Sequence, residues 1–356
     1  MITETERFVI REIRGELIGF EKPTEVLKKG ARAYVGILSE NVSRDTVTAL
    51  KKAGAQEVLS GYRRAGIKVN LGGGIAGCEA TYTDPLVVEG IIDFCLEIGV
   101  EPFVCEADMR GFVMDERLIK RRGDLWKVLQ RKKTPFINLS ENPVKFYCLG
   151  LETSLTFPKE LLDPQTAIIS ASVPKDHWEC GISFCQKNMY GAISERRKAI
   201  YHRSWSRIDK VVACACRILT PNLAILGGRY AGVGWGPHFC IPIPLDRVVV
   251  GKDAIQVDAV MAEVYGYPYE KVKYAMINTH GIVPSCELIE GSAEFPREVV
   301  KRIRCHAMTP RRRFFWKTLL FPQYFTPHKF QHKIAPKLEN LAARFHHKFI
   351  DKMARE

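Results

Sequence analysis

Several motifs that would assign this chain of 356 residues to a common class of protein are missing. The 11 cysteines include no C-x-x-C pair, and this spacing argues against an iron–sulfur cluster or a zinc finger. The phosphate-loop motif G-x-x-x-x-G-K-S/T does not occur. The dinucleotide-binding motif, G-x-G-x-x-G between a strand and a helix, does not occur either. ATP and NAD sites therefore have no motif, and the identity of any cofactor stays open.

Spanning and secretory segments are missing as well. No apolar run reaches the roughly 18 residues that a transmembrane helix needs, and the charged residues 1–14 lack the apolar centre of a secretory signal. Most cysteines lie in apolar runs, as Cys95, Cys105 and Cys214 do, which is typical of buried free thiols in a reducing compartment. We therefore expect a cytoplasmic protein that is at most peripheral at a membrane.

Positive charge is concentrated at the C-terminus. Residues 301–356 hold 14 Lys or Arg against three acidic residues, a net charge of +11 out of +13 for the chain. Basic side chains alternate with aromatic ones over residues 311–317 and on a final helix carrying Leu341, Phe345, Phe349 and Met353. This pattern is typical of a membrane interface or a partner groove, and equally of a segment packed on its own domain. The near-neutral remainder argues against nucleic-acid binding.

The rest of the chain alternates strand and helix patterns. An apolar strand at residues 66–71 precedes three glycines, a helix beginning at Asp84 and Pro85, and a further strand at residues 101–105. This succession predicts a parallel β-α-β unit. We expect an α/β fold with a mixed, mostly parallel sheet, flanking helices and a basic C-terminal helical appendage.

The length fits one large domain or two. We predict an α/β domain over residues 1–300, which could divide into lobes at 30–165 and 166–300, and a helical tail over residues 301–356. In the second lobe, strands at residues 166–173 and 223–226 precede a long glycine-rich loop at 227–237.

Basic and imidazole side chains follow the strand at residues 166–173. They are Lys175, His177, Lys187, Arg196, Arg197 and His202. In open α/β sheets, ligands bind at the carboxyl ends of the strands. Cations and imidazoles gathered there favour an anion-binding site, a proton-transfer site, or both.

The motifs occur in an order that resembles one family, the domain-of-unknown-function family 362, whose members are often labelled iron–sulfur cluster-binding proteins. The matching elements are Asn70 after a strand, residues 81–85 before a helix, Pro174-Lys175, Lys187-Asn188-x-x-Gly191, the 227–237 loop and Gly251-x-Asp253-x-x-x-x-Asp258. The chain lacks the second Lys of the relatives' Pro-Lys-x-Lys-x-His pattern and the ferredoxin-like module that some of them carry. The resemblance, over residues 70–281, implies a fold and a site, and the label alone suggests redox chemistry.

Lys187 is the first candidate for catalysis. Flanked by Asn188 and Gly191, it lies in a turn-like or helix-start context where backbone amides could also face an anion. Other cations would lower its pKa, as a general acid or a carbonyl-binding amine requires, although a surface Lys paired with Asp176 would fit the same sequence. His177 and His202 are candidates for moving protons, or for structural hydrogen bonds to the backbone.

Further residues are predicted to contact the ligand. Lys175, Arg196 and Arg197 would bind its carboxylate or phosphate, and the motif residues Asn70, Thr81 and Asn188 would lie beside it. Backbone could approach the ligand closely in the glycine segments that contain Gly73 and Gly234, where Trp235 could form a wall against a flat substrate.

Three carboxylates complete the set of candidates. Asp253 fits either a helix cap or a ligand contact. Asp258 stands among apolar residues, and a buried carboxylate needs a partner such as Lys187 or Lys175. Glu106, at the end of a strand, is a similar candidate, and a metal held by Glu106, Asp258 and His177 is an alternative without a spacing signature.

We therefore expect an enzyme, an oxidoreductase or an isomerase, that acts on a small anionic metabolite bearing a carboxylate or phosphate. Lys175, Lys187 and an imidazole would bind the charge and move protons. The alternative is a non-catalytic binding or scaffold protein that docks on a membrane or a protein partner through residues 301–356.

Overall fold

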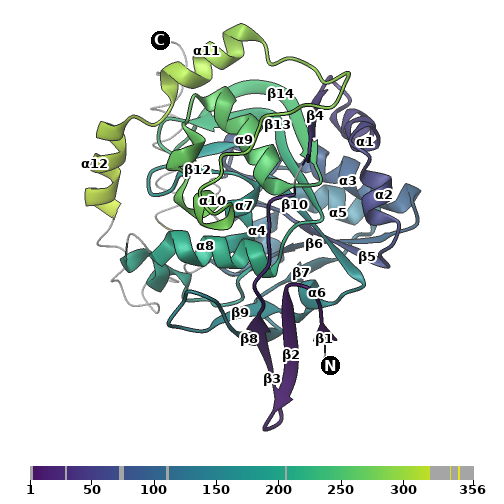
Figure 1. Ribbon diagram of the computed structural model, residues 1–356. Helices are drawn as coiled ribbons and strands as arrows, with labels where there is room; N and C mark the ends of the chain where they lie inside the picture. Colours follow the sequence, from purple (N-terminus) through teal and green to yellow (C-terminus); the bar gives the residue numbers. More distant parts are fainter. Residues whose placement is uncertain are drawn as a thin grey trace.

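The computed structural model describes residues 3–320 apart from 29, 72–75, 110–111 and 205–206, together with residues 337 and 344. In this part of the chain, a nine-stranded mixed sheet forms the centre of the molecule (Figure 1). Along the sheet lie β12 (Gly181–Ser183), β11 (Lys175–His177), β13 (Leu223–Val233), β10 (Thr166–Ser172), β5 (Arg64–Lys68), β6 (Glu101–Glu106) and β7 (Phe136–Asn138). The remaining strands are β14 (Ile241–Gly251), which pairs with β13, and β4 (Ala33–Ile37), which pairs with β14.

The middle of this sheet is parallel, as the sequence predicts. Strand β10 pairs in parallel with β5 and β13, and β5 pairs in parallel with β6. Helix α3 (Pro85–Glu97) connects β5 to β6, and it begins where expected because the Asp84 carboxylate accepts a hydrogen bond from the Leu86 amide. The predicted β-α-β unit and the mixed, mostly parallel α/β fold are therefore confirmed.

Helices cover both faces of the sheet, because alternate residues of a strand point to opposite faces. On β6, Val104 packs with one core, whereas Phe103 and Cys105 pack with the other. The first core includes α1 (Val42–Lys52), α2 (Ala55–Leu59), α3, α4 (Glu116–Ile119) and α5 (Leu125–Lys132). The second includes α6 (Lys159–Leu162), α7 (Cys185–Asn188), α8 (Arg207–Ile218), α9 (Ala254–Tyr265) and α10 (Lys273–Asn278). Short 3₁₀ helices lie at Glu79–Thr81, Met189–Ala192, Lys198–Arg203 and Tyr269–Lys271.

A separate five-stranded sheet packs against the second core. Its order is β1 (Thr3–Glu4), β2 (Phe8–Ile13), β3 (Glu16–Glu21), β8 (Pro143–Tyr147) and β9 (Leu155–Pro158). The β2–β3 hairpin, purple in Figure 1, projects from the bottom of the view. Phe146 lies so close to the backbone of β3 that a Cβ on Gly19 would come within 2.3 Å of its ring.

The glycine-rich segment differs from the prediction. Residues 227–233 belong to β13 and pair with β14, so only the turn that follows them is a loop. Glycines persist in this strand because neighbours approach it closely. A Cβ on Gly227 would lie 2.2 Å from the Arg247 carbonyl oxygen, and one on Gly232 would lie 2.5 Å from the Ala80 carbonyl oxygen.

Strands from both predicted lobes lie in the nine-stranded sheet, since β4, β5, β6 and β7 precede residue 166 and the other five follow it. The appendage begins with α11 (Arg297–His306) and α12 (Pro310–Leu320), at the upper left of Figure 1. The predicted helix around Leu341, Phe345, Phe349 and Met353 lies outside the described residues. Among the described residues, none of the helices combines the length and the apolar character required to cross a membrane.

Candidate functional site

The carboxyl ends of three adjacent parallel strands bring the predicted site residues together. Glu106 ends β6, Asn70 follows β5, and Lys175 follows β10 as the first residue of β11. Because β10, β5 and β6 run side by side in the same direction, these residues meet at one edge of the sheet. The sequence predicted this location.

One half of the edge carries a buried ion pair. Lys68 Nζ lies 2.8 Å from Glu106 Oε1, and the two side chains are 0% and 1% exposed. Lys68 also donates to the carbonyl oxygen of Val69 and to Oδ1 of Asn188. Glu106 Oε2 accepts a hydrogen bond from the Leu71 amide at 3.1 Å. Each charge therefore has an opposite charge and further hydrogen bonds, as a buried pair requires.

The other half of the edge carries a buried lysine with neutral partners. Lys175 Nζ donates to Asn70 Oδ1 at 2.8 Å and to the carbonyl oxygen of Thr81 at 2.5 Å. Burial lowers the pKa of Lys175 to about 8, and the charge of Lys187 acts in the same direction. Lys175 can therefore be a cation or a neutral amine near neutral pH.

Lys187 lies on the short helix α7, close enough to Lys175 on β11 for its charge to act on that residue. Its side chain is only 9% exposed, and its Nζ lies 5.6 Å from the centre of the Tyr190 ring. Within the described residues, Lys187 forms no ion pair with a carboxylate. Its charge lowers the pKa of both Lys175 and His177. The expected ion pair between Lys187 and Asp176 does not form, and the charge of Lys187 also acts on the carboxyl group of Asp209.

Asn188, the next residue, holds the two halves together. Its side-chain amide donates to the carbonyl oxygen of Lys68 at 2.8 Å and to Ser170 Oγ at 3.2 Å. Its Oδ1 accepts a hydrogen bond from Lys68 Nζ, and the same Oδ1 accepts from the side-chain nitrogen of Asn70 at 3.4 Å. Asn188 thus fixes α7 to the ends of β5 and β10, so the position of Lys187 follows from the sheet.

His177 is buried and neutral. Its Nδ1 accepts hydrogen bonds from the amides of Glu179 and Cys180 at 3.1 and 3.3 Å, which leaves the proton on Nε2. Burial is the main reason why its pKa lies well below the ordinary value. The nearby charges of Lys187, His202, His238 and Lys175 lower the pKa further. His177 therefore forms the structural hydrogen bonds to the backbone that were the alternative to a role in proton transfer. Its Nε2–H is the group that can donate to a ligand.

His202 belongs to a chain of three buried side chains. Its Nδ1 lies 2.5 Å from Glu179 Oε2, and its Nε2 lies 3.0 Å from Tyr190 Oη. Tyr190 Oη also donates to the carbonyl oxygen of Lys198. Because the Tyr190 ring lies beside Lys187, this chain connects the predicted imidazole to the lysine through a phenol.

The two aspartates of the family motif act as helix caps. Asp253 caps α9 by accepting from the Ile255 amide, and it also accepts from the Lys28 amide. Asp258 accepts from the amides of Cys185 and Gln186 at the start of α7. Backbone amides therefore replace the lysine partner expected for Asp258. Burial raises the pKa of Asp258 to about 7 despite these hydrogen bonds.

The turn after β13 is held by Asp176 and by the appendage. Asp176 accepts from the amides of Gly234 and Gly236 and from the amide of Met308, which precedes α12. Burial raises the pKa of Asp176 to about 7. The Arg312 guanidinium lies 5.1 Å from the centre of the Trp235 ring, so the indole contacts the appendage.

Arg313 fixes the other side of this region. It donates to the carbonyl oxygens of Trp178 and Glu179 and to Tyr267 Oη. The described part of the appendage, up to residue 320, therefore packs on the β11–β12 hairpin that carries His177, as a segment packed on its own domain would.

The remaining predicted residues lie apart from the lysines or outside the description. Arg196 is exposed, and its Nε lies 2.9 Å from the Asp108 carboxylate, which already balances its charge. Arg197 is exposed at the surface. Gly73 lies outside the described residues. For the metal alternative, Glu106, Asp258 and His177 Nδ1 are each engaged by different partners, and they are not among the described side chains that converge as metal ligands.

Sequence reasoning missed Lys68, Lys198, Glu179 and Tyr190. Lys68 had a signal, because a lysine inside an apolar strand pattern must be buried with a partner. Lys198 Nζ donates to the Gly191 carbonyl oxygen, and burial lowers its pKa to about 8. Glu179 and Tyr190 had no local signal, because only the fold brings them to His202.

Two comparisons with known proteins agree with this architecture. The family model described as "Domain of unknown function (DUF362)" matches residues 66–263, more than half of the 356 residues. Thylakoid-associated protein sll1697 of Synechocystis sp. (strain ATCC 27184 / PCC 6803 / Kazusa) is similar over 241 residues at 22% identity, covering 66% of this chain and 73% of that protein. The matched region contains the whole edge formed by Lys68, Glu106, Lys175 and Lys187. This chain belongs to the DUF362 family.

Proposed function

We propose that the protein binds a small carboxylate- or phosphate-bearing metabolite between Lys175, Lys187 and His177, and catalyses proton transfer next to the bound anion. The observation that carries the proposal is the charge balance of this edge. Lys175 is buried with neutral hydrogen-bond partners, and Lys187 is nine-tenths buried and forms no ion pair with a carboxylate within the described residues. Burying ammonium groups without an opposite charge is costly, and an anionic ligand would supply that charge.

The neighbouring groups support a proton-transfer reaction. His177 presents Nε2–H as a neutral donor, and Lys175, with a pKa of about 8, can exchange a proton near neutral pH. Neutral Lys175 would remove a proton beside the carboxylate or phosphate and, as an ammonium, return it at another atom of the ligand, while His177 Nε2–H donates a hydrogen bond, so the reaction would be an isomerisation.

Anion binding tests the proposal directly. Isothermal titration with inorganic phosphate and with small dicarboxylates should give saturable binding to the full chain. Lys187→Met should weaken this binding roughly 10- to 100-fold, the equivalent of one charge-assisted hydrogen bond. Lys159→Met removes an exposed lysine on α6 and serves as the matched control. Equal affinities of the wild type and the Lys187→Met variant would exclude the site.

A second candidate function, peripheral docking on an anionic membrane, rests on α12. Phe314 and Phe315 are 72% and 55% exposed, and the exposed Arg311 lies on the same short helix. Exposed aromatic rings beside arginines fit the interface of an anionic bilayer. A relative whose name describes it as thylakoid-associated is consistent with such a location.

Vesicle flotation tests this second candidate. Full-length protein should float with vesicles that contain an anionic phospholipid, and Phe314→Ser with Phe315→Ser should reduce the recovered fraction several-fold. Ile282→Ser with Val283→Ser is the control, because these apolar side chains are 59% and 51% exposed without neighbouring arginines in sequence. Equal recovery of the two double variants would contradict docking through α12.

A further inference from the structure

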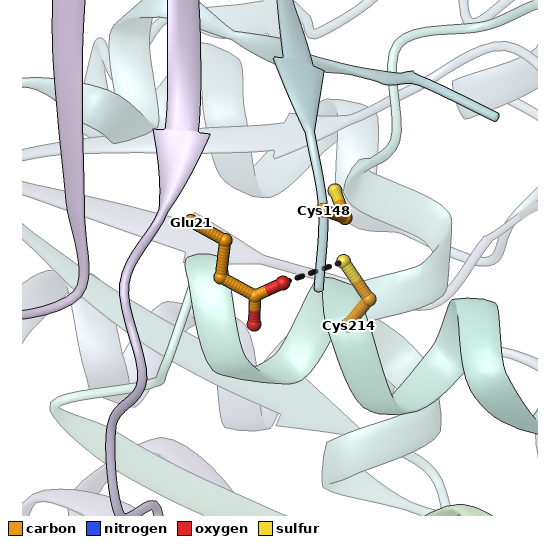
Figure 2. Close-up of side chains that lie close together, drawn as sticks. All are labelled: Glu21, Cys148 and Cys214. Atoms are coloured by element: carbon orange, nitrogen blue, oxygen red, sulfur yellow. Dashed lines mark hydrogen bonds between the residues drawn. The ribbon is translucent and has the colours of Figure 1, made fainter. Parts of the chain in front are cut away.

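A second group of chemically reactive side chains lies away from the lysine edge. Glu21, Cys148 and Cys214 are buried, and one ligand atom from each lies within 4.8 Å of the others (Figure 2). They come from three elements, because Glu21 ends β3, Cys148 follows β8, and Cys214 lies on α8. Two thiols and a carboxylate that converge from separate elements are a donor set for a metal ion.

The carboxylate is held in a fixed orientation toward the sulfur atoms. Arg217 Nε donates to Glu21 Oε1 at 2.5 Å, and the Leu149 amide donates to Oε2 at 2.6 Å. Cys214 Sγ lies 3.8 Å from the same Oε2, along the dashed line in Figure 2. Arg217 thus holds both carboxylate oxygens, because its Nη2 also donates to Oε2 at 3.3 Å, and Oε2 is the oxygen that faces the thiols. Carboxylates that bind metals are typically oriented by such outer hydrogen bonds.

We propose that Glu21, Cys148 and Cys214 bind one thiophilic divalent cation, of which zinc is the typical case. Zinc bonds to thiolate sulfur at about 2.3 Å in a tetrahedral arrangement, so two ligating sulfurs stand about 3.8 Å apart. The present spread of at most 4.8 Å needs only a small contraction to reach that geometry. Water would occupy the fourth position, on the side of Cys148, which is 8% exposed.

The charge balance of the cluster permits this binding. The Arg217 guanidinium balances the charge of the Glu21 carboxylate. Two thiolate ligands would balance the two charges of the cation, so that the occupied cluster would be neutral. A buried site that remains neutral avoids the main penalty of burying an ion.

The bound cation would join the small sheet to the body. Glu21 belongs to the five-stranded sheet, whereas Cys214 belongs to a helix that packs in the second core. Glu21 lies outside residues 66–263, which the family model matches, whereas Cys148 and Cys214 lie inside them. Metal binding should therefore stabilise the attachment of the N-terminal hairpin.

Zinc titration of the full-length, reduced chain tests the proposal. The wild type should bind one zinc per chain, and cobalt in its place should give a thiolate-to-cobalt charge-transfer band in the near ultraviolet. Cys148→Ser and Cys214→Ser should each weaken zinc binding at least 100-fold and abolish the band. The control is Cys216→Ser, which alters another buried cysteine of α8 and should leave both unchanged.

Two results would overturn the proposal. The first is a wild type that binds no more zinc than the Cys148→Ser, Cys214→Ser double variant. The second is a Cys216→Ser variant that loses zinc to the same degree as Cys214→Ser, because general damage to α8 would then explain the loss. Circular dichroism of each variant shows whether the fold is retained.

Discussion

The buried lysines in the two halves of one sheet edge differ in whether a carboxylate forms an ion pair with them. At the ends of β5 and β6, Lys68 is paired with Glu106 at 2.8 Å, and both side chains are fully buried. Lys175, which follows β10, and Lys187 on α7 are buried without an ion pair to a carboxylate within the described residues. The charges of the first half balance each other, whereas the proposed function assigns an anionic ligand to the second half. The contrast separates a structural ion pair from a proposed binding site.

Breaking the paired half should have the largest effect. Glu106→Gln removes the carboxylate that faces Lys68 and leaves a buried ammonium without an opposite charge. Removing one partner of a buried pair typically costs about 3–5 kcal/mol of the free energy of unfolding. Urea unfolding followed by circular dichroism measures the loss.

The matched control lies at the other end of the same strand. Glu101 is 58% exposed and lies 3.8 Å from Arg64, and exposed pairs of this kind contribute about 0–1 kcal/mol. Glu101→Gln should therefore leave the unfolding midpoint nearly unchanged. Equal losses in the two variants would show that the Lys68–Glu106 pair is not special.

The same substitution in the two halves should change stability in opposite directions. Lys68→Met leaves Glu106 buried without its partner and should lower the free energy of unfolding by about 3 kcal/mol. Lys187→Met removes a buried ammonium that forms no ion pair with a carboxylate within the described residues, and should raise the free energy of unfolding by about 1 kcal/mol. Both values come from denaturant unfolding in an anion-poor buffer. A clear loss in Lys187→Met would contradict the contrast.

The parts of the site that sequence reasoning found are those with local signals. The strand before Lys175 is an uninterrupted apolar run, and Asp84 with Pro85 marks a helix start, so the edge of the sheet could be located in advance. Asp258 could not be interpreted in the same way. Its partners are amides of α7, about 70 residues earlier in the chain, and only the packing of α9 against α7 brings them together.

The errors have a common physical cause. The glycines within residues 227–232 predict a loop when the local sequence is considered alone. They lie in the strand β13 instead, and glycine is required there because the backbone of Arg247 and Ala80 approaches too closely for a side chain. Similarly, Arg196 looked available for an anion, but a carboxylate from the segment after β6, Asp108, balances its charge. Close approach and ion pairing between distant segments are tertiary effects that local patterns do not encode.

The pH dependence of stability gives a smaller but more specific comparison. Asp176 and Asp258 have pKa values raised to about 7 by burial, so the folded chain binds more protons than the unfolded chain between about pH 4 and pH 7. Their contribution to stability therefore falls as pH rises through that window. Lys175 and Lys198 have pKa values lowered to about 8, so their contribution rises as pH increases from about 8 to about 10.5. These four groups together predict a minimum of stability between pH 7 and pH 8.

An anion should raise the stability at this minimum, because Lys175, with a pKa of about 8, is still mostly protonated there. Sulfate is a suitable probe, since its charge stays constant from pH 5 to pH 10. At pH 7.5, millimolar sulfate should raise the melting temperature by a few degrees, which corresponds to about 1–2 kcal/mol. At pH 9.5 the gain should shrink, because Lys175 has lost its proton and binds the anion less well. Lys187→Met should abolish the gain at pH 7.5, whereas Lys159→Met should keep it. A gain that is the same at both pH values, or that persists in Lys187→Met, would indicate a general salt effect and would remove the basis for treating the two halves of the edge differently.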